Sequence, residues 1–171
     1  MREAVNRMQE LVPGKLEITL EGIVHDLTSP NAPHELTAYR VSRRLEAVMP
    51  DGLLAHTGKP DVEDVREGIM RRPDVMVIAE EDMEDDGPFD PRTLLAAIEV
   101  VSCSNPQNDW CGKIRDYALL GIPVYAIFDP RTGQGAVLSG PQYATRKNFV
   151  YGEDVTIGDW TISTENLPRY Q

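Results

Sequence analysis

The chain has 171 residues, of which 28 are Asp or Glu and 17 are Lys or Arg, so its formal net charge is −11. This acidic balance argues against a non-specific DNA coat or a polybasic membrane binder, because both need a net positive surface. It does not exclude an enzyme that acts on nucleic acid, since acidic groups that hold a divalent metal offset the repulsion locally. The 41% of hydrophobic residues excludes a disordered protein and a disulfide-based mini-domain.

The N-terminal third predicts a helix, a hairpin and a longer helix. Pro13-Gly14 ends the first helix. Apolar and polar residues then alternate from Leu16 to Glu21, which is typical of a half-buried strand. The predicted elements are a helix over 1–12, strands over 16–20 and 23–27, a loop over 28–33 and a helix over 34–49.

The middle of the chain predicts buried strands around an acidic segment. Residues 53–56 predict a short strand, and 57–72 give no clear pattern. The apolar runs 75–79 and 94–101 predict buried strands. Between them, 80–90 holds seven acidic residues, which we interpret as a solvated hairpin loop because a calcium loop would need acids at alternating positions and a closing Glu.

The second half predicts a crossover between parallel strands. A helix over 106–120 joins strand 94–101 to a third apolar strand over 123–128, and such βαβ units are right-handed. Return strands are expected over 135–139 and within 149–157. The order of elements predicts an α/β or α+β domain with a mixed sheet. We find no internal repeat or linker, so residues 1–171 are expected to form a single domain.

Targeting and redox signals are weak. Cys103 and Cys111 are eight residues apart, which fits neither a redox nor a zinc motif, so we expect two reduced, partly buried thiols in a cytoplasmic protein. The first residues lack the apolar core of a signal peptide, and no apolar run approaches the ~20 residues that span a bilayer, so no membrane partner is expected. His34-Glu35 lacks the second His of a zinc-protease motif.

Two acidic residues occupy positions that are costly for a charge. Glu99 lies inside an apolar strand, and Asp74 opens another directly after Pro73. If the two strands pair, their carboxylates come together and form a site for a hard cation, Mg²⁺ or Mn²⁺. The structural alternative is that Asp74 caps a turn and Glu99 pairs with an Arg at the sheet edge.

Lys113 follows Asp109 by one helical turn on the helix after Glu99. In the functional interpretation its ammonium reaches the two carboxylates, and Tyr117 lies one turn further along the same face. In the structural interpretation, Lys113 forms an i,i+4 salt bridge on the surface, worth a few tenths of a kcal/mol.

These residues together resemble a known nuclease family. The pattern is similar to that of the Uma-two family, a group described as restriction endonucleases within the PD-(D/E)XK nuclease superfamily. The resemblance covers about 16–130 and is most specific over 73–130. The matching residues are Pro73-Asp74, Ile98-Glu99-Val100-Val101-Ser102, Asp109, Lys113, Tyr117, Gly121-Ile122-Pro123, Tyr125 and Asp129.

The resemblance implies a metal-dependent endonuclease with a PD-(D/E)XK-like mixed sheet flanked by helices. It implies catalytic roles for Asp74, Glu99 and Lys113, with Asp74, Glu99 and Val100 at the metal. Val101 stands where the superfamily usually has its Lys, so Lys113 would supply that charge from the helix. The nuclease-like core would cover about 16–140, with a C-terminal β extension. Secondary candidates for the site are His34, Asp109 and Tyr117.

The resemblance implies two partners. One is nucleic acid as the substrate, expected to be DNA, and the other is a second copy of the chain. A homodimer is expected because enzymes that cut both strands often use two-fold symmetry. Apolar segments around Phe149-Val150-Tyr151 and Trp160 are candidate dimer contacts. The alternative function is a catalytically inactive nuclease fold that serves as a binding or dimerisation module, which the acidic net charge favours.

Overall fold

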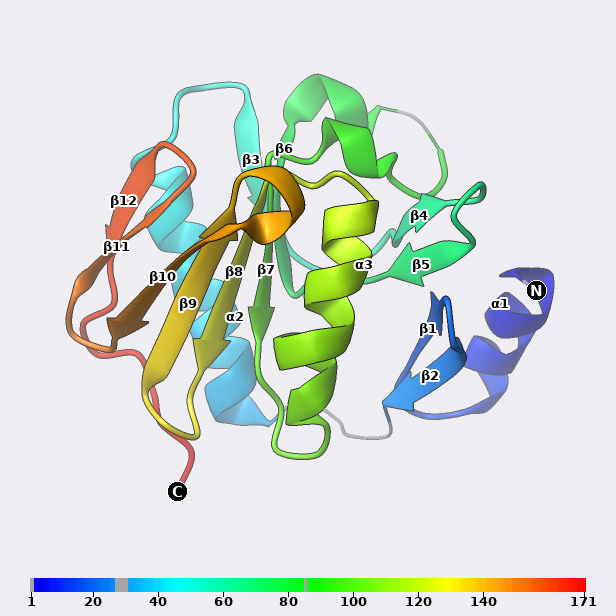
Figure 1. Cartoon of the computed structure of the whole chain (residues 1–171), viewed down its shortest axis with the longest axis horizontal. Coiled ribbons are helices and arrows are strands. Elements are labelled where there is room, and N and C mark those ends of the chain that lie inside the picture. Colours follow the sequence, from blue (N-terminus) through cyan, green and yellow to red (C-terminus); the bar gives the residue numbers. More distant parts are fainter. Residues whose placement is uncertain (1, 27–30, 85) are drawn as a thin grey trace.

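A six-stranded mixed sheet forms the centre of the computed structural model, which describes residues 2–26, 31–84 and 86–171 (Figure 1). Its strand order is β10-β9-β8-β7-β6-β3, and β7 and β8 are parallel whereas the other neighbours are antiparallel. The predicted mixed sheet is therefore confirmed. The strands are β3 (Leu53–His56), β6 (Val75–Ala79), β7 (Ala96–Val100), β8 (Val124–Asp129), β9 (Gln134–Ser139) and β10 (Thr145–Val150).

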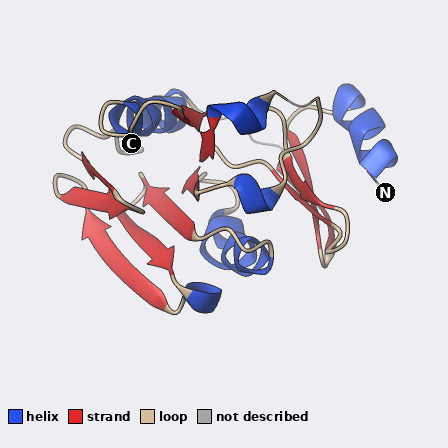
Figure 2. Ribbon diagram, turned by 90° about the horizontal axis from the view of Figure 1, so that it is seen from above, coloured by secondary structure: helices blue, strands red, loops and turns tan. Residues whose placement is uncertain are grey.

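Each face of this sheet is covered by a different helix (Figures 1 and 2). One apolar cluster joins α2 (Ala32–Glu46) to one face, together with the hairpin of β11 (Asp154–Ile157) and β12 (Trp160–Ser163). The other cluster packs the opposite face against α3 (Lys113–Leu119). Because Ile98 and Val100 belong to the first cluster, strand alternation turns Glu99 toward α3.

A second, four-stranded sheet lies at the N-terminal end, in the order β2-β1-β5-β4 (Figure 1). The helix α1 (Arg2–Leu11) packs on it through Val5, Leu16, Ile18 and Met70. Its strands are β1 (Lys15–Thr19), β2 (Gly22–Asp26), β4 (Val62–Asp64) and β5 (Ile69–Arg71). The sequence left 57–72 without a prediction because three-residue strands are too short to show a period of two.

A buried cation joins the second sheet to α3. The Arg71 guanidinium of β5 lies 2.7 Å from Glu17 Oε2 of β1 and 2.6 Å from Asp116 Oδ2 of α3. It also donates to Asn108 Oδ1 over 3.1 Å. The prediction for β1 was therefore wrong on one point: Glu17, expected on the solvent face, is 3% exposed, whereas Leu20 is exposed.

Several further expectations need correction. The helix predicted over 106–120 is not regular, because Asn108–Gly112 forms a π-helix before α3. Cys103 and Cys111 are exposed rather than partly buried. Of the candidate dimer contacts, Phe149 is buried and Tyr151 and Trp160 are partly buried against the core, whereas Val150 is exposed. Leu27 and Thr28–Pro30 of the predicted strand and loop lie outside the described residues.

In the described part of the chain, no helix combines the length and the apolar character that crossing a bilayer requires.

Candidate metal and nuclease site

Asp74 and Glu99 lie at the ends of two neighbouring strands. Strands β6 and β7 pair antiparallel with Val75 opposite Ile98, so the next pair outward brings Asp74 beside Glu99. The Val100 amide donates a hydrogen bond to Asp74 Oδ2 over 2.8 Å. The side chain of Asp74 is 18% exposed, whereas that of Glu99 is 1% exposed. The expected hairpin thus brings one accessible and one buried carboxyl group together.

Lys113 reaches inward from the first turn of α3. Its Nζ lies 2.8 Å from Glu99 Oε2 and 2.8 Å from Asp109 Oδ1, and the residue is 5% exposed. The i,i+4 salt bridge between Lys113 and Asp109 is therefore present, but it is buried and does not lie on the surface as the structural interpretation expected. The partner of Glu99 is Lys113 and not an Arg. Tyr117, one turn further along, donates its hydroxyl to Glu99 Oε1 over 2.5 Å. The ammonium and the phenol fix the Glu99 side chain from one helix.

The π-helix positions Asp109 at the same point. A π-helical turn widens the backbone, is rare, and is frequently found at functional sites. The Asp109 carbonyl accepts a hydrogen bond from the buried Tyr125 hydroxyl over 3.0 Å, which ties this turn to β8. Asp109 itself is 4% exposed. Its carboxylate therefore shares Lys113 with Glu99, away from bulk water.

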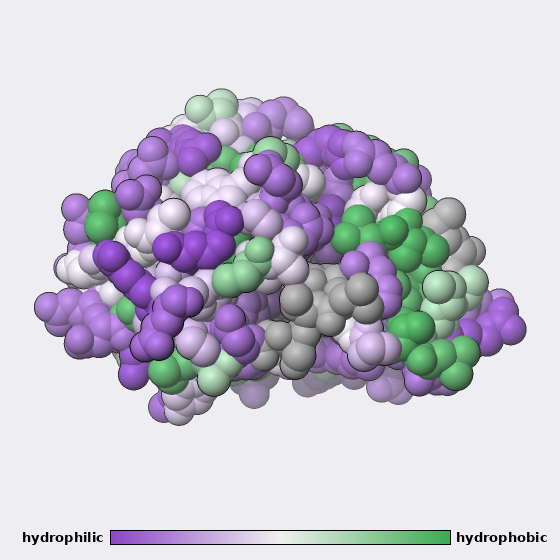
Figure 3. Space-filling model, turned by 90° about the horizontal axis from the view of Figure 1, so that it is seen from below, coloured by the Kyte–Doolittle hydropathy of each residue, from purple (hydrophilic) through white to green (hydrophobic). Residues whose placement is uncertain are grey.

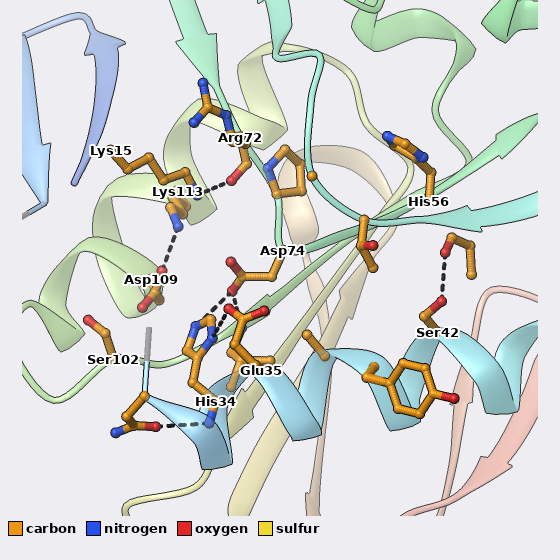
Figure 4. A pocket seen from close by; sticks show the side chains of 18 of the residues that line it. Lys15, His34, Glu35, Ser42, His56, Arg72, Asp74, Ser102, Asp109 and Lys113 are labelled. Atoms are coloured by element: carbon orange, nitrogen blue, oxygen red, sulfur yellow. Dashed lines mark hydrogen bonds and ion pairs between the residues drawn. The ribbon is translucent and has the colours of Figure 1, made fainter. Parts of the chain in front are cut away.

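His34 approaches Asp74 from the opposite helix, α2. Asn31 caps this helix by accepting the His34 amide over 2.9 Å, which is the usual role of Asn at an N-cap. His34 Nε2 then lies 3.3 Å from Asp74 Oδ2 (Figure 4). The secondary candidates His34, Asp109 and Tyr117 therefore all contact one of the residues Asp74, Glu99 and Lys113.

Burial and neighbouring charges shift the pKa values of the acidic side chains in opposite directions. Burial raises the pKa of Glu99 to about 8, against the opposing effect of the Lys113 ammonium. Burial also raises the pKa of Asp109. Burial acts in the same direction on Asp74, but the hydrogen bond from His34 and the charge of Lys15 outweigh it and lower the pKa of Asp74. Burial opposes the charge of Lys113, yet Asp109 and Glu99 raise its pKa well above the usual value, so it stays protonated.

A cleft of about 1050 Å³ opens in front of Asp74. Figure 4 shows Asp74, Asp109 and Lys113 gathered at one end of it together with Lys15 and Arg72. The sequence did not predict roles for Lys15 and Arg72 at the cleft or for the buried Arg71. Arg71-Arg72 directly before Pro73-Asp74 was the available signal, but charged residues without periodicity are usually solvated.

The site fits a hard cation that keeps part of its water shell. Glu99 Oε2 is buried and, among the described residues, accepts no hydrogen bond of normal geometry although Lys113 lies close by. In that part of the chain no three His, Cys, Asp or Glu residues come together as a ready-made metal cage. Mg²⁺ needs no such cage, because it commonly binds one or two carboxylates and retains several waters.

The comparisons with known proteins concern the fold and the family of the chain. A crystal structure described as a putative nuclease belonging to DUF820, from Anabaena variabilis ATCC 29413, has a similar fold with a TM-score of 0.66. It is 16% identical in sequence, and the match covers 86% of this chain and 85% of that chain. No curated protein sequence matches. The model of the Uma2 family, described as "Putative restriction endonuclease", matches residues 3–163, and the chain therefore belongs to that family.

Proposed function

We propose that this protein is a Mg²⁺- or Mn²⁺-dependent endonuclease that hydrolyses phosphodiester bonds of DNA. Family and fold indicate a restriction-endonuclease-like nuclease, whose substrate is a nucleic acid. The observation that carries the proposal is the convergence of Asp74, Glu99 and Lys113 from two strands and a helix: Asp74 and Lys113 line one cleft, and the buried Glu99 contacts Lys113.

In this proposal Asp74 and Glu99 would hold the ion through their carboxylates, and Val100 would contribute through its main chain. A bound Mg²⁺ would supply polarisation of a phosphate oxygen and would lower the pKa of a water. Water adds to phosphorus, one P–O bond breaks, and the leaving oxygen takes up a proton. Lys113 holds Glu99 and Asp109 in place, and Tyr117 fixes the orientation of Glu99. His34 orients Asp74 from α2.

A cleavage assay on duplex DNA with and without Mg²⁺ or Mn²⁺ tests the proposal. We expect cleavage that requires the metal and that Glu99→Ala abolishes. Glu81→Ala is the matched control, because Glu81 is an exposed acid outside the cleft. Single-stranded DNA and RNA of the same sequence define the substrate. Cleavage that persists in Glu99→Ala at the same rate would contradict the assignment of the site.

A second candidate is a nuclease fold that binds a partner and cuts nothing. The observation in its favour is that Lys113 already lies against Glu99 and compensates part of its charge. Titration calorimetry with Mn²⁺ separates the two candidates. The enzyme is expected to bind Mn²⁺ and to lose this binding in Asp74→Ala, whereas absence of binding in the unmodified protein supports the second candidate.

A further inference from the structure

The charges at the site leave an incoming phosphate without a partner. Ligands of a bound metal ion are deprotonated, so with a divalent ion in place Asp74, Glu99 and Asp109 would carry up to three negative charges against the one positive charge of Lys113. A divalent ion would neutralise the remaining two and leave nothing for the negative phosphodiester. Lys113 cannot serve both purposes, because its ammonium is buried between Glu99 and Asp109. A further cation is required where the cleft is open.

Lys15 is placed to provide this cation. It lines the cleft, and its side chain is 23% exposed, compared with 6% for Lys113. Its Nζ donates to the Arg72 carbonyl, two residues before Asp74, and lies 3.5 Å from Glu17 Oε1. An ammonium has three donors. Among the described residues the Arg72 carbonyl and the Glu17 carboxylate are its two partners, so a donor remains for a ligand in the cleft.

The two arginines that line the cleft are oriented by acids outside the group of Asp74, Glu99 and Asp109. Arg72 Nε lies 2.5 Å from Asp61 Oδ1, and Arg43 Nη1 lies 3.0 Å from Glu46 Oε2. The charge of Lys15, by contrast, lowers the pKa of Asp74, Glu99 and Asp109 alike, although less than other groups do. Glu17 does not cancel this charge, because Glu17 is paired with Arg71 at 2.7 Å.

We infer that Lys15 binds the scissile phosphate, donating to a non-bridging oxygen and neutralising the charge that the metal and Lys113 leave uncompensated. The inference rests on the proposed function and adds to it a residue from outside the central sheet. The second sheet then supplies part of the substrate site as well as packing against α3. The competing explanation is purely structural: Lys15 would only tie β1 to the Arg72 carbonyl.

Four proteins test this inference: the unmodified chain, Lys15→Gln, Lys15→Arg and Lys147→Gln. Gln keeps a donor for the Arg72 carbonyl but loses the charge, and Arg keeps the charge. Lys147 on β10 is exposed and lies outside the cleft, so its substitution controls for net charge. Binding of a duplex DNA is measured in Ca²⁺ at several salt concentrations, with a gel to confirm that the DNA stays intact, and single-turnover cleavage is measured in Mg²⁺.

We expect Lys15→Gln to reduce the slope of log K against log salt by about 0.9, the value for one lost phosphate contact. We also expect it to slow cleavage by about tenfold or more, while Lys15→Arg keeps the slope and Lys147→Gln keeps both. A slope and a rate for Lys15→Gln equal to those of the unmodified protein overturn the role of Lys15 and leave the nuclease proposal standing. If the unmodified protein binds DNA but does not cleave it, the nuclease proposal is overturned, and the salt slope of Lys15→Gln still tests whether Lys15 contacts phosphate. If the unmodified protein neither binds nor cleaves DNA, both proposals are overturned.

Discussion

Lys113 has the burial of a core residue and the charge of a surface residue. Two carboxylates at 2.8 Å compensate for the loss of water around its ammonium. Both carboxyl groups are themselves buried, and one of them, Glu99, is held by Tyr117 as well. The hydrogen bonds and ion pairs of this group therefore compensate one another for the water that each polar side chain has lost.

We predict that Lys113→Ala abolishes cleavage and lowers the free energy of unfolding by about 3–5 kcal/mol, because it leaves buried carboxyl groups without a cation. Lys113→Arg is expected to restore cleavage poorly, since a planar fork does not place its charge as an ammonium does. Urea unfolding and the cleavage assay are the measurements. A stability loss under about 1 kcal/mol would match an exposed ion pair and contradict the burial seen here.

The central residues of the site were predictable because they break a pattern. Glu99 interrupts an apolar strand, where a carboxylate is costly unless it is paired or bound to a metal. Lys15, Glu17 and Arg71 break no pattern, because charged residues in alternating or irregular segments are normally solvated. Only the packing of the second sheet against α3 buries Glu17 and Arg71 and brings Lys15 to the cleft. Their roles depend on tertiary contacts that no local sequence signal carries.

At the scale of elements, the hairpins and the crossover were predicted well, and helix details were not. The apolar runs that became β6, β7 and β8 are fully buried strands, for which hydrophobicity alone is a strong signal. A π-helix leaves no such signal, because its residues also fit an α-helix. Gly112 lies within it beside Asn108 and Arg71, where little space is left for a side chain.

Two glycines allow a comparison of strand and helix packing. A Cβ at Gly135 of β9 would overlap both the Phe149 ring and the Ile127 main-chain oxygen. A Cβ at Gly112 would lie 3.1 Å from the Asn108 side-chain oxygen and 3.5 Å from Arg71 Nη2. Neither glycine has a positive φ, so backbone strain does not oppose an Ala at either position. The room available for the Cβ differs between them.

We predict that Gly135→Ala destabilises the protein by about 1–3 kcal/mol, because backbone of the central strands must move. Gly112→Ala is expected to cost less, since a side chain can yield and Ala favours a helix by roughly 1 kcal/mol over Gly. Thermal or urea unfolding of both variants checks the order. Equal losses would mean that Asn108 and Arg71 are as rigid as the sheet.

At the scale of the whole molecule, the Glu17–Arg71–Asp116 group connects the N-terminal sheet to α3. Burial acts against the charge of Glu17, but Lys15, Lys113 and Arg71 outweigh it and lower its pKa below the usual 4.5. The folded state therefore binds this proton more weakly than the unfolded state does. The resulting stability is fully present above about pH 4.5 and is lost as the pH falls below that value.

We predict that Glu17→Gln lowers the free energy of unfolding by about 3–5 kcal/mol at pH 7, because it breaks a buried ion pair. The difference in unfolding free energy between Glu17→Gln and the unmodified protein should shrink toward pH 3. At that pH the unfolded unmodified chain binds a proton at Glu17, which stabilises the unfolded state. Urea unfolding over this pH range is the measurement, with the exposed Glu81→Gln as the control.

We also propose that residues 1–171 form a single domain, so one unfolding transition is expected at every pH in this range.

We retain the proposal of a homodimer, although Val150 is the exposed member of the expected C-terminal contacts and Phe149 is buried. Figure 3 shows an apolar area, coloured green, at its right, toward the N-terminal end of the molecule. The exposed apolar residues of the N-terminal segment include Met8, Leu11, Leu20 and Ile23. We predict that light scattering reports a dimer at tens of micromolar and that Leu11→Asp shifts it toward the monomer. A monomer at this concentration for the unmodified protein would contradict the prediction.

The buried Arg71 also dictates an order of assembly during synthesis. Its two carboxylate partners are separated from it by 54 residues toward the N-terminus and 45 toward the C-terminus. A nascent chain that ends before residue 116 has already made the N-terminal sheet but lacks half of the anions that surround Arg71. Since N-terminal segments emerge from the ribosome first, that sheet must wait for α3 before it can dock. Lys15 therefore reaches the cleft late, and a chain still being translated does not yet present the complete site.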